Sequence, residues 1–391
     1  MKGRVGIGKI KNDPAVRKEQ GYKMEKKYED RLIETLKDRQ EHTDYHGAPL
    51  LVKNLPDCDE KGAMDPRLYQ DMKAQLKIMG WMPKKFMKMD TSEKGIANLR
   101  KMFNEVKSIP CVEEDIYIEK RTVRAKDGYL IPIRIYKRHK DDEKKSVLYY
   151  IHGGGFFGGS PDVVEESVKM FVAKTGLSAV SPDYRLVPEN PYPTGHEDCY
   201  CVLKWIYENA SSFGGDSERI FVAGDSAGGN LAQYCTTRDW EDGFYRIRGQ
   251  LLLYPTLNMA GIEDRFYKPG MEHFEMAPHQ KKGLSKMIQM FSGMTSGLEM
   301  ILGTSDIRND YLNPYTRDAR NNPPTFLTVG EHDFLKIETL GYGAKLHEAG
   351  VEVKMVLYKG FGHAFFDNTG VYPQCEDCID EMGEFILHYC E

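Results

Sequence analysis

One serine stands between glycines where a predicted strand meets a predicted helix. The run Gly224–Gly229 reads Gly-Asp-Ser-Ala-Gly-Gly and follows the apolar run Ile220–Ala223. Strand, tight glycine turn and helix form the context in which a G-x-S-x-G serine is exposed as a nucleophile. The glycines let strand and helix pass closely, and the N-terminus of the helix favours a developing oxyanion. We therefore predict that Ser226 is a catalytic nucleophile.

A cluster of glycines upstream can supply the oxyanion hole that such a serine needs. His152–Gly155 comes directly after the strand-like run Ser146–Ile151. Consecutive glycine amides can turn toward a carbonyl oxygen, and the amide after the nucleophile completes the site. The plainer alternative is a flexible glycine turn, but its pairing with the serine motif favours the oxyanion hole. The predicted donors are the amides of Gly153, Gly154, Gly155 and Ala227.

An acid and a histidine follow two successive predicted strands. A nucleophilic serine needs a base, and the base needs an orienting acid. Asp333 follows the run Thr325–Gly330, and His363 follows the run Val351–Tyr358. Open α/β sheets place ligand-binding groups at these carboxyl ends of strands. We assign Asp333 as the acid and His363 as the base, with Glu331 as the competing acid.

Together these motifs resemble the hormone-sensitive lipase family of α/β-hydrolases, which includes many bacterial carboxylesterases and acetyl esterases. The matching segments are His152–Gly155, Asp183–Glu189, Gly224–Gly229, Leu253–Pro255, Asp333–Leu335 and Gly362–Phe365. The resemblance covers about residues 65–391 and implies the same triad of Ser226, Asp333 and His363. It also implies that His152 holds the glycines by hydrogen bonds. The chain departs from the family at Phe334, where proline is common, and at Ala364, where glycine is common.

The order of predicted elements indicates an α/β fold. From about Pro110 onward, strand-like and helix-like runs alternate, which predicts a mostly parallel sheet flanked by helices. A hairpin is expected over Ile116–Val123 and Tyr129–Tyr136. The resemblance implies the α/β-hydrolase fold, with an eight-stranded sheet and a helical cap.

The chain divides into two predicted parts. Residues 1–109 are expected to form a charged N-terminal extension and a helical cap segment. Met24–Glu41 is expected to be a solvated helix that packs on the cap, with a mobile arm as the alternative. Residues 110–391 are expected to form the catalytic domain, with a helical cap insertion at about 258–308. That insertion is too long for a structureless loop.

Apolar side chains near the motifs are candidates for the substrate pocket. The insertion is rich in methionine, a flexible and polarizable residue that suits an adaptable acyl pocket. Ordinary core packing is the alternative for these residues. Aromatic residues next to the oxyanion and base motifs are rival pocket walls. The candidates are Phe156, Phe157, Phe365, Met287 and Met290.

Composition limits the partners and cofactors. The 391 residues carry a formal net charge of −5, which gives no reason to expect a nucleic-acid or anionic membrane partner. No run approaches the roughly 18 apolar residues of a spanning helix, and no apolar segment follows the basic start of the chain. Eight cysteines suit a reduced compartment, so we expect a cytoplasmic protein. Cys375 and Cys378 lack a second pair of ligands, so we expect neither a metal nor a cofactor.

The sequence therefore predicts a serine carboxylesterase that hydrolyses short- to medium-chain acyl esters through an acyl-enzyme. An acyltransferase or an amidase with the same triad is an alternative, because the motifs do not separate these reactions. A non-catalytic binding protein on this fold is disfavoured because His363 is present. The expected partner is a small-molecule ester, and a homodimer is one candidate assembly, since dimers occur in the resembling family.

Overall fold

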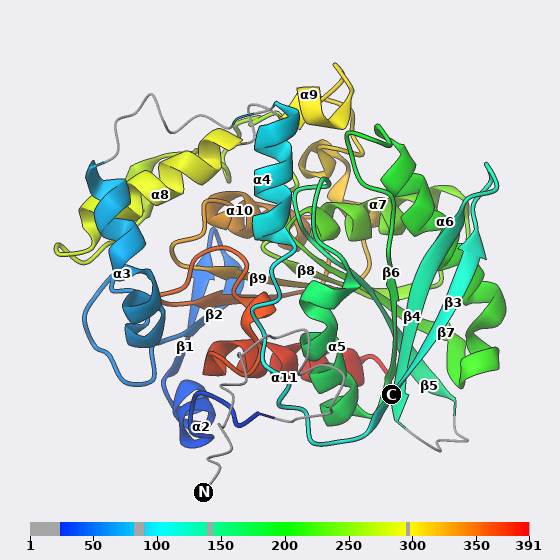
Figure 1. Cartoon of the computed structure of the whole chain (residues 1–391), viewed down its shortest axis with the longest axis horizontal. Coiled ribbons are helices and arrows are strands. Elements are labelled where there is room, and N and C mark those ends of the chain that lie inside the picture. Colours follow the sequence, from blue (N-terminus) through cyan, green and yellow to red (C-terminus); the bar gives the residue numbers. More distant parts are fainter. Residues whose placement is uncertain (1–23, 82–89, 91, 139–143, 295–297, 391) are drawn as a thin grey trace, which may run out of the picture.

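The computed structural model describes residues 24–81, 90, 92–138, 144–294 and 298–390. Within these ranges the strands form one sheet in the order β1-β2-β10-β9-β8-β7-β5-β6-β4-β3 (Figure 1). The strands are β1 (Gln40–Tyr45), β2 (Ala48–Lys53), β3 (Ile116–Arg124), β4 (Leu130–Arg138), β5 (Lys145–Ile151), β6 (Ser178–Pro182), β7 (Gly215–Asp225), β8 (Ile247–Leu253), β9 (Thr325–Gly330) and β10 (Val353–Tyr358). From β2 to β6 all neighbours are parallel, and an antiparallel strand or hairpin closes each edge.

Helices cover both faces of this sheet, so its central strands are buried runs of apolar residues. The helices are α2 (Arg31–Asp38), α3 (Pro66–Trp81), α4 (Glu93–Phe103), α5 (Pro161–Thr175), α6 (Thr194–Asn209), α7 (Ala227–Glu241), α8 (Lys281–Met294), α9 (Leu298–Leu302), α10 (Lys336–Glu348) and α11 (Pro373–His388). Helix α5 packs with α11 on one face, and α6, α7 and α10 lie on the other (Figure 1). Every residue of β6 and β9 is buried, as is typical of parallel strands covered on both faces.

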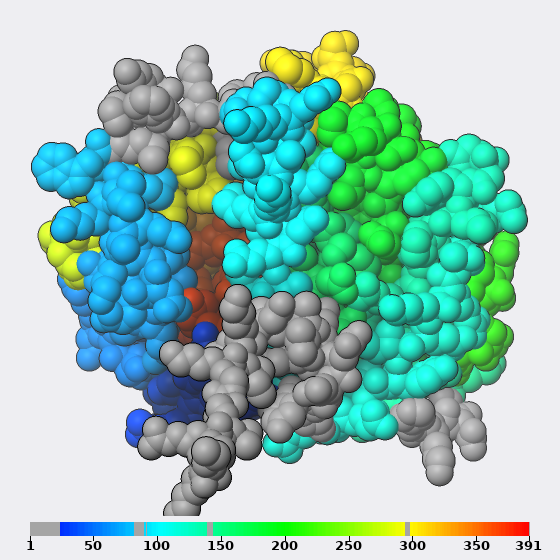
Figure 2. Space-filling view, in the orientation of Figure 1, coloured from blue at the N-terminus to red at the C-terminus, as the bar shows by residue number. Residues whose placement is uncertain are grey.

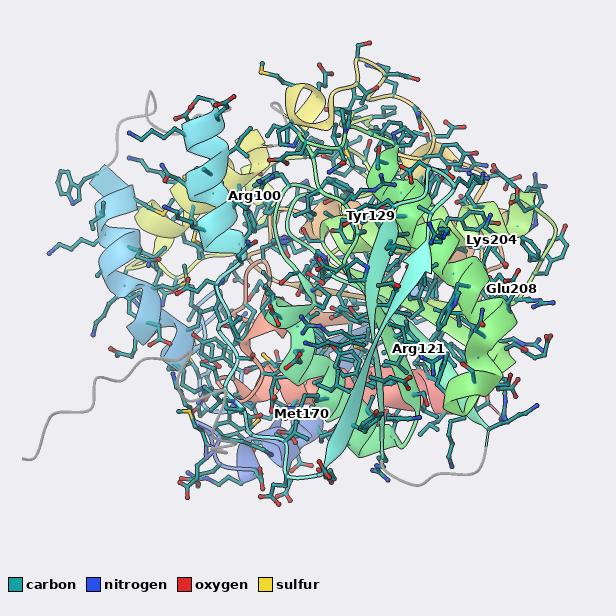
Figure 3. The ribbon with its side chains drawn as sticks, turned by 45° about the vertical axis from the view of Figure 1, so that its right-hand side comes forward. Arg100, Arg121, Tyr129, Met170, Lys204 and Glu208 are labelled. Carbon is teal, nitrogen blue, oxygen red and sulfur yellow. The ribbon has the colours of Figure 1, made fainter. Side chains whose placement is uncertain are left out.

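Local sequence signals set the ends of several elements. Ser160 caps the N-terminus of α5, since its hydroxyl accepts the amide of Asp162. Gly176, with a φ of 71°, caps the C-terminus. Ser92 caps the N-terminus of α4, since its side chain accepts the amide of Gly95. The expected hairpin is present as β3 and β4 beside α6 (Figure 3), with the guanidinium of Arg121 5.9 Å from the ring centroid of Trp205.

The sheet has ten strands within the described residues, and not the eight that were expected. The two additional strands, β1 and β2, come from residues 40–53, inside the part expected to hold only the extension and the cap. Strand β2 is apolar and pairs with β10, so this segment belongs to the sheet of the catalytic domain. Strand β1 is an exposed edge strand of polar and charged residues. The helix expected over Met24–Glu41 is shorter, since α2 ends at Asp38 and the next strand begins at Gln40.

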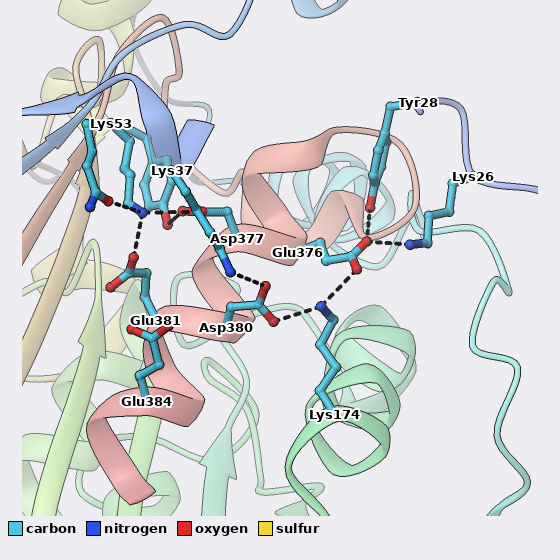
Figure 4. A network of polar contacts seen from close by, with 12 residues as sticks. Lys26, Tyr28, Lys37, Lys53, Lys174, Glu376, Asp377, Asp380, Glu381 and Glu384 are labelled. Carbon is cyan, nitrogen blue, oxygen red and sulfur yellow. Dashed lines mark hydrogen bonds and ion pairs between the residues drawn. The ribbon is translucent and has the colours of Figure 1, made fainter. Parts of the chain in front are cut away.

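Ion pairs join the N-terminal segment to the acidic helix α11 (Figure 4). Lys26 Nζ lies 2.8 Å from Glu376 Oε2, on the first turn of α11. Lys53 has a fully buried side chain, and its Nζ lies 2.5 Å from Glu381 Oε1 and 3.3 Å from Asp377 Oδ1. Burial lowers the pKa of Lys53, but the two carboxylates outweigh burial and raise it above its usual value. The segment is therefore anchored to the domain by a partly exposed ion pair at Lys26 and by buried ion pairs at Lys53.

Three helices, α3, α4 and α8, lie beyond the carboxyl edge of the sheet (Figure 1) and are called the cap below. Helices α3 and α8 pack together around a small apolar core of their own, made of Met64, Leu76, Phe274, Leu284, Met287 and Ile288. Figure 2 shows a hollow between the α3 and α4 segments, with orange-red atoms from late in the chain at its floor. Within the described ranges, no helix has the length and apolar content needed to cross a membrane.

Candidate active site

Ser226 occupies a strained turn between β7 and α7. Its φ is 54° and its ψ is −118°, a conformation that costs a non-glycine residue about 1–3 kcal/mol. A Cβ on Gly224 would lie 2.2 Å from the carbonyl oxygen of Gly228. A Cβ on Gly228 would lie 2.1 Å from the carbonyl oxygen of Ile151. Both glycines are therefore required for this turn, and the strand-turn-helix context predicted from the sequence is present.

Ser226, His363 and Asp333 form one chain of hydrogen bonds. His363 Nε2 lies 2.8 Å from Ser226 Oγ, and His363 Nδ1 lies 2.9 Å from Asp333 Oδ2 and 3.1 Å from Oδ1. With Asp333 ionised, Nδ1 donates to the carboxylate, and Nε2 is left to accept the hydroxyl proton of Ser226. The arrangement can remove a proton from a serine that attacks a carbonyl carbon.

The environment makes His363 a stronger base than a free imidazole. Its side chain is 14% exposed, and that of Asp333 is fully buried. Burial lowers the pKa of His363, but the carboxylates of Asp333 and Asp225 outweigh burial and raise it above its usual value. Asp333 also accepts the amide of Leu335 at 2.8 Å, which fixes the orientation of the carboxylate.

Glu331, the competing acid, lies in a different set of contacts. Its carboxylate accepts Lys359 Nζ at 2.6 Å and the amide of Gly360 at 3.0 Å. These bonds hold the turn after β10, and that turn leads to His363. Glu331 therefore supports the backbone of the histidine segment, while Asp333 contacts the imidazole itself.

The glycine loop, residues 152–159, lies beside Ser226, but one of its predicted amide donors is occupied. The amide of Gly153 donates to Asp225 Oδ1 at 2.9 Å, so it is not free to bind an oxyanion. For the amides of Gly154, Gly155 and Ala227, we find no acceptor within the described part of the chain. Gly154 and Gly155 have φ values of 117° and 62°, which only glycine adopts readily. The loop can thus offer two amides, with that of Ala227 at the start of α7 as a third, and the prediction for Gly153 is corrected.

His152 holds this loop, as the resemblance implied. Its Nδ1 lies 2.8 Å from the carbonyl oxygen of Gly153. Its ring stacks on Tyr184 with centroids 4.4 Å apart, and the Tyr184 hydroxyl donates to the His152 carbonyl at 2.9 Å. Burial lowers the pKa of His152 to about 4, so the ring stays neutral at pH 7.

Comparison with known proteins gives the fold family. Residues 148–367 match the family described as alpha/beta hydrolase fold, which is more than half of the chain. The chain belongs to this α/β-hydrolase family. The resemblance drawn from the motifs and the predicted fold class are therefore confirmed.

Individual relatives of this α/β-hydrolase carry esterase names. Carboxylesterase NlhH of Mycobacterium tuberculosis is 32% identical over 286 residues, which cover 72% of this chain and 86% of that protein. Esterase LipI of the same species is 29% identical and covers 83% of this chain and 94% of its own length. A solved esterase from Pyrobaculum calidifontis, at 27% identity, has a TM-score of 0.63 and covers 84% of this chain and 99% of its own.

In this α/β-hydrolase, aromatic rings that were not among the predicted site residues contact the histidine. The rings of Phe334 and Tyr254 have centroids 4.8 Å and 4.9 Å from that of His363. Phe291, on cap helix α8, stacks on Phe334 at 5.8 Å. Phe334 directly follows the acid, and its difference from the family's proline was the one signal that could have found it. Phe291 carried no such signal, because it is distant in sequence from every motif.

Four of the five predicted pocket residues, all but Met290, are buried in packing contacts. Phe156 packs on His196 at 5.7 Å, and Phe157 packs on Phe103 at 5.3 Å. Phe365 contacts Tyr254 and Tyr358, and all three phenylalanines are at most 4% exposed. Met287 lies in the core between α3 and α8, and Met290 is half-buried on α8. Rings this buried offer little surface to a substrate, so Phe334 and Phe291 are better candidates for a pocket wall.

Proposed function

We propose that this protein is a serine carboxylesterase. The observation that carries the proposal is the chain from Asp333 through His363 to Ser226. Three free amides near the serine, those of Gly154, Gly155 and Ala227, support it. The relatives add support, since several of them are named carboxylesterase, esterase or arylesterase.

The proposed reaction follows from the geometry. His363 Nε2 takes the proton of Ser226 as Oγ attacks the ester carbonyl, and the free amides bind the negative oxygen that forms. The protonated histidine then gives its proton to the departing alcohol, which leaves an acyl-serine. Water, deprotonated by the same histidine, attacks the acyl-serine and releases the carboxylic acid. Each missing amide of such a hole typically costs about 2.7–4 kcal/mol of transition-state stabilisation.

Short- to medium-chain acyl esters are the proposed substrates, because two aromatic rings stand beside the histidine. Phe334 lies against the imidazole, and Phe291 of the cap lies against Phe334. Two stacked rings at this place leave less room for a long chain than an open cleft would. The acyl-transfer and amide-hydrolysis alternatives use the same triad, and no contact among the described residues favours them.

The proposal is tested with p-nitrophenyl esters from acetate to palmitate, using Ser226→Ala as the blank. We expect serine-dependent hydrolysis with the highest kcat/KM among the shorter esters. Rates equal to the blank on every ester would contradict esterase activity. A maximum at palmitate would leave the reaction in place but contradict the proposed chain length.

A further inference from the structure

The glycine loop is held at two places, and its free amides lie between them. On one side, the amide of Gly153 is bound by Asp225, the residue that precedes the nucleophile. On the other side, the loop folds back, and the amides of Phe157 and Gly158 donate to the carbonyl of Gly154 at 3.3 Å and 2.9 Å. The directions of the Gly154 and Gly155 amides therefore depend on both ends of this stretch.

The C-terminal end of cap helix α4 supplies the contacts on the second side. Arg100 Nε donates to the carbonyl of Phe157 at 2.6 Å, and Arg100 extends from α4 toward the α/β domain (Figure 3). Asn104, directly after the helix, accepts the amide of Gly159 on Oδ1 at 2.8 Å. Phe103 packs edge-on against the ring of Phe157, with centroids 5.3 Å apart. Three side chains from the C-terminal end of α4 thus contact residues 157–159 of the loop.

Arg100 is itself held in a fixed orientation. Its Nη2 donates to the carbonyl of Val187 at 2.9 Å, and both terminal nitrogens donate to the carboxylate of Glu189 at 2.8 Å and 2.9 Å. The side chain is 27% exposed, and its hydrogen bonds lower the pKa of Glu189. A planar guanidinium with these partners keeps one geometry, which a lysine ammonium cannot reproduce. The guanidinium of Arg100 is therefore already oriented to donate to the carbonyl of Phe157.

We infer that Arg100 and Asn104 are positioning residues, through which the cap aims the Gly154 and Gly155 amides at the substrate oxygen. The inference rests on the proposed function for its catalytic consequence. The contacts that hold α4 against the domain are then the same contacts that orient the oxyanion hole. The cap thereby contributes to stabilisation of the transition state. Displacement of a catalytic group by about 1 Å can cost about a hundredfold in rate.

Steady-state kinetics tests the catalytic consequence. Arg100→Ala is compared with Lys101→Ala, an exposed neighbour on the same helix, using p-nitrophenyl acetate. We expect Arg100→Ala to lower kcat about tenfold to a hundredfold with KM changed less than about threefold, and Lys101→Ala to behave as wild type. Arg100→Lys should recover only part of the loss. An unchanged kcat, or a raised KM with kcat unchanged, would overturn the inference, because either result limits α4 to substrate binding.

Hydrogen exchange tests the same anchor without relying on catalysis. The amides of Phe157, Gly158 and Gly159 should exchange faster in Arg100→Ala than in wild type, while those of α7 stay unchanged. Asn104→Ala should speed exchange at Gly159, and Asn104→Asp should not, because it keeps the acceptor oxygen. Unchanged loop exchange in both alanine variants would overturn the inference even if the enzyme is active. If wild type shows no serine-dependent hydrolysis, the proposed function fails, and the exchange data still decide whether α4 anchors the loop.

Discussion

Asp225 Oδ1 accepts the amide of Gly153 at 2.9 Å, so the residue before the nucleophile fixes the start of the glycine loop. The same oxygen accepts the hydroxyl of Tyr150 at 3.0 Å. One carboxylate thus joins the serine turn at the end of β7 to the loop at the end of β5. These strands are neighbours in the sheet, and the contact sets the spacing between Ser226 and the free amides.

This buried carboxyl group makes stability depend on pH. Burial, with the nearby charge of Asp367 second, raises the pKa of Asp225 from 3.8 to about 7. Because this pKa is higher in the folded than in the unfolded protein, the protonated Asp225 carboxyl stabilises the fold. That contribution is complete below pH 3.8 and is lost as pH rises through about 7. Asp225→Asn cannot ionise and keeps an oxygen acceptor. Relative to wild type, the free energy of unfolding of Asp225→Asn should therefore improve as pH rises from about 4 to about 7 and level off above that, as measured by urea denaturation. A difference that does not vary with pH would contradict this assignment.

The two candidate acids should differ sharply in their effect on rate. Asp333→Asn leaves Nδ1 of His363 without its carboxylate, which in serine hydrolases lowers kcat by about 10⁴. It should also shift the acidic limb of the kcat/KM profile to lower pH, because Asp333 helps to raise the pKa of His363. Glu331→Gln removes the ion pair with Lys359 and should mainly lower thermal stability. A larger loss of kcat in Glu331→Gln than in Asp333→Asn would exchange their roles.

Lys53 should be essential for stability although it is far in sequence from the motifs. Lys53→Met leaves Asp377 on α11 without its buried counter-ion and Glu381 with only the partly exposed Lys354, and the loss of one partner of a buried pair typically costs about 3–5 kcal/mol. Lys37→Met is the matched control, since its ion pair with Asp380 is partly exposed and should contribute less than about 1 kcal/mol. Equilibrium urea unfolding of the two variants measures both effects. Equal, small losses would show that the buried network does not stabilise the fold.

Phe291 should set the preferred acyl chain length. Phe291→Ala removes the cap ring that stacks on Phe334 and leaves the contact of Phe334 with His363 in place. We expect the maximum of kcat/KM to move toward longer p-nitrophenyl esters, with kcat on the acetate ester little changed. Met290→Ala, a change on the same helix at a half-exposed position, is the control. An unaltered chain-length profile in Phe291→Ala would exclude this ring from the pocket.

The triad geometry could be predicted because each part of it carries a local signal. The turn at Ser226 requires glycines at fixed offsets, and Asp333 and His363 each follow a recognisable strand. Strand β1 could not be predicted, because its residues are polar and exposed and it gains its structure by pairing with β2. The occupied amide of Gly153 also escaped prediction, since it depends on where the side chain of Asp225 points.

The pocket was the least predictable part of the site. Methionines on α8 suggested a lining, but the packing of α8 against α3 places Met287 in the core of the cap. Phe291 reaches the site because one helical turn from Met287 carries its ring over Phe334. Which turn of this apolar face meets the site is decided by tertiary packing, and the sequence pattern of the helix does not settle it.

The central claim, that Ser226 is the nucleophile activated by His363, is tested most directly by covalent labelling. Wild type, Ser226→Ala and His363→Ala are each incubated with a fluorophosphonate, and the modified peptide is identified by mass spectrometry. We predict one adduct in wild type, on the peptide that contains Ser226, with none in Ser226→Ala and much slower labelling in His363→Ala. Undiminished labelling of Ser226→Ala, or an adduct on another residue, would contradict the claim.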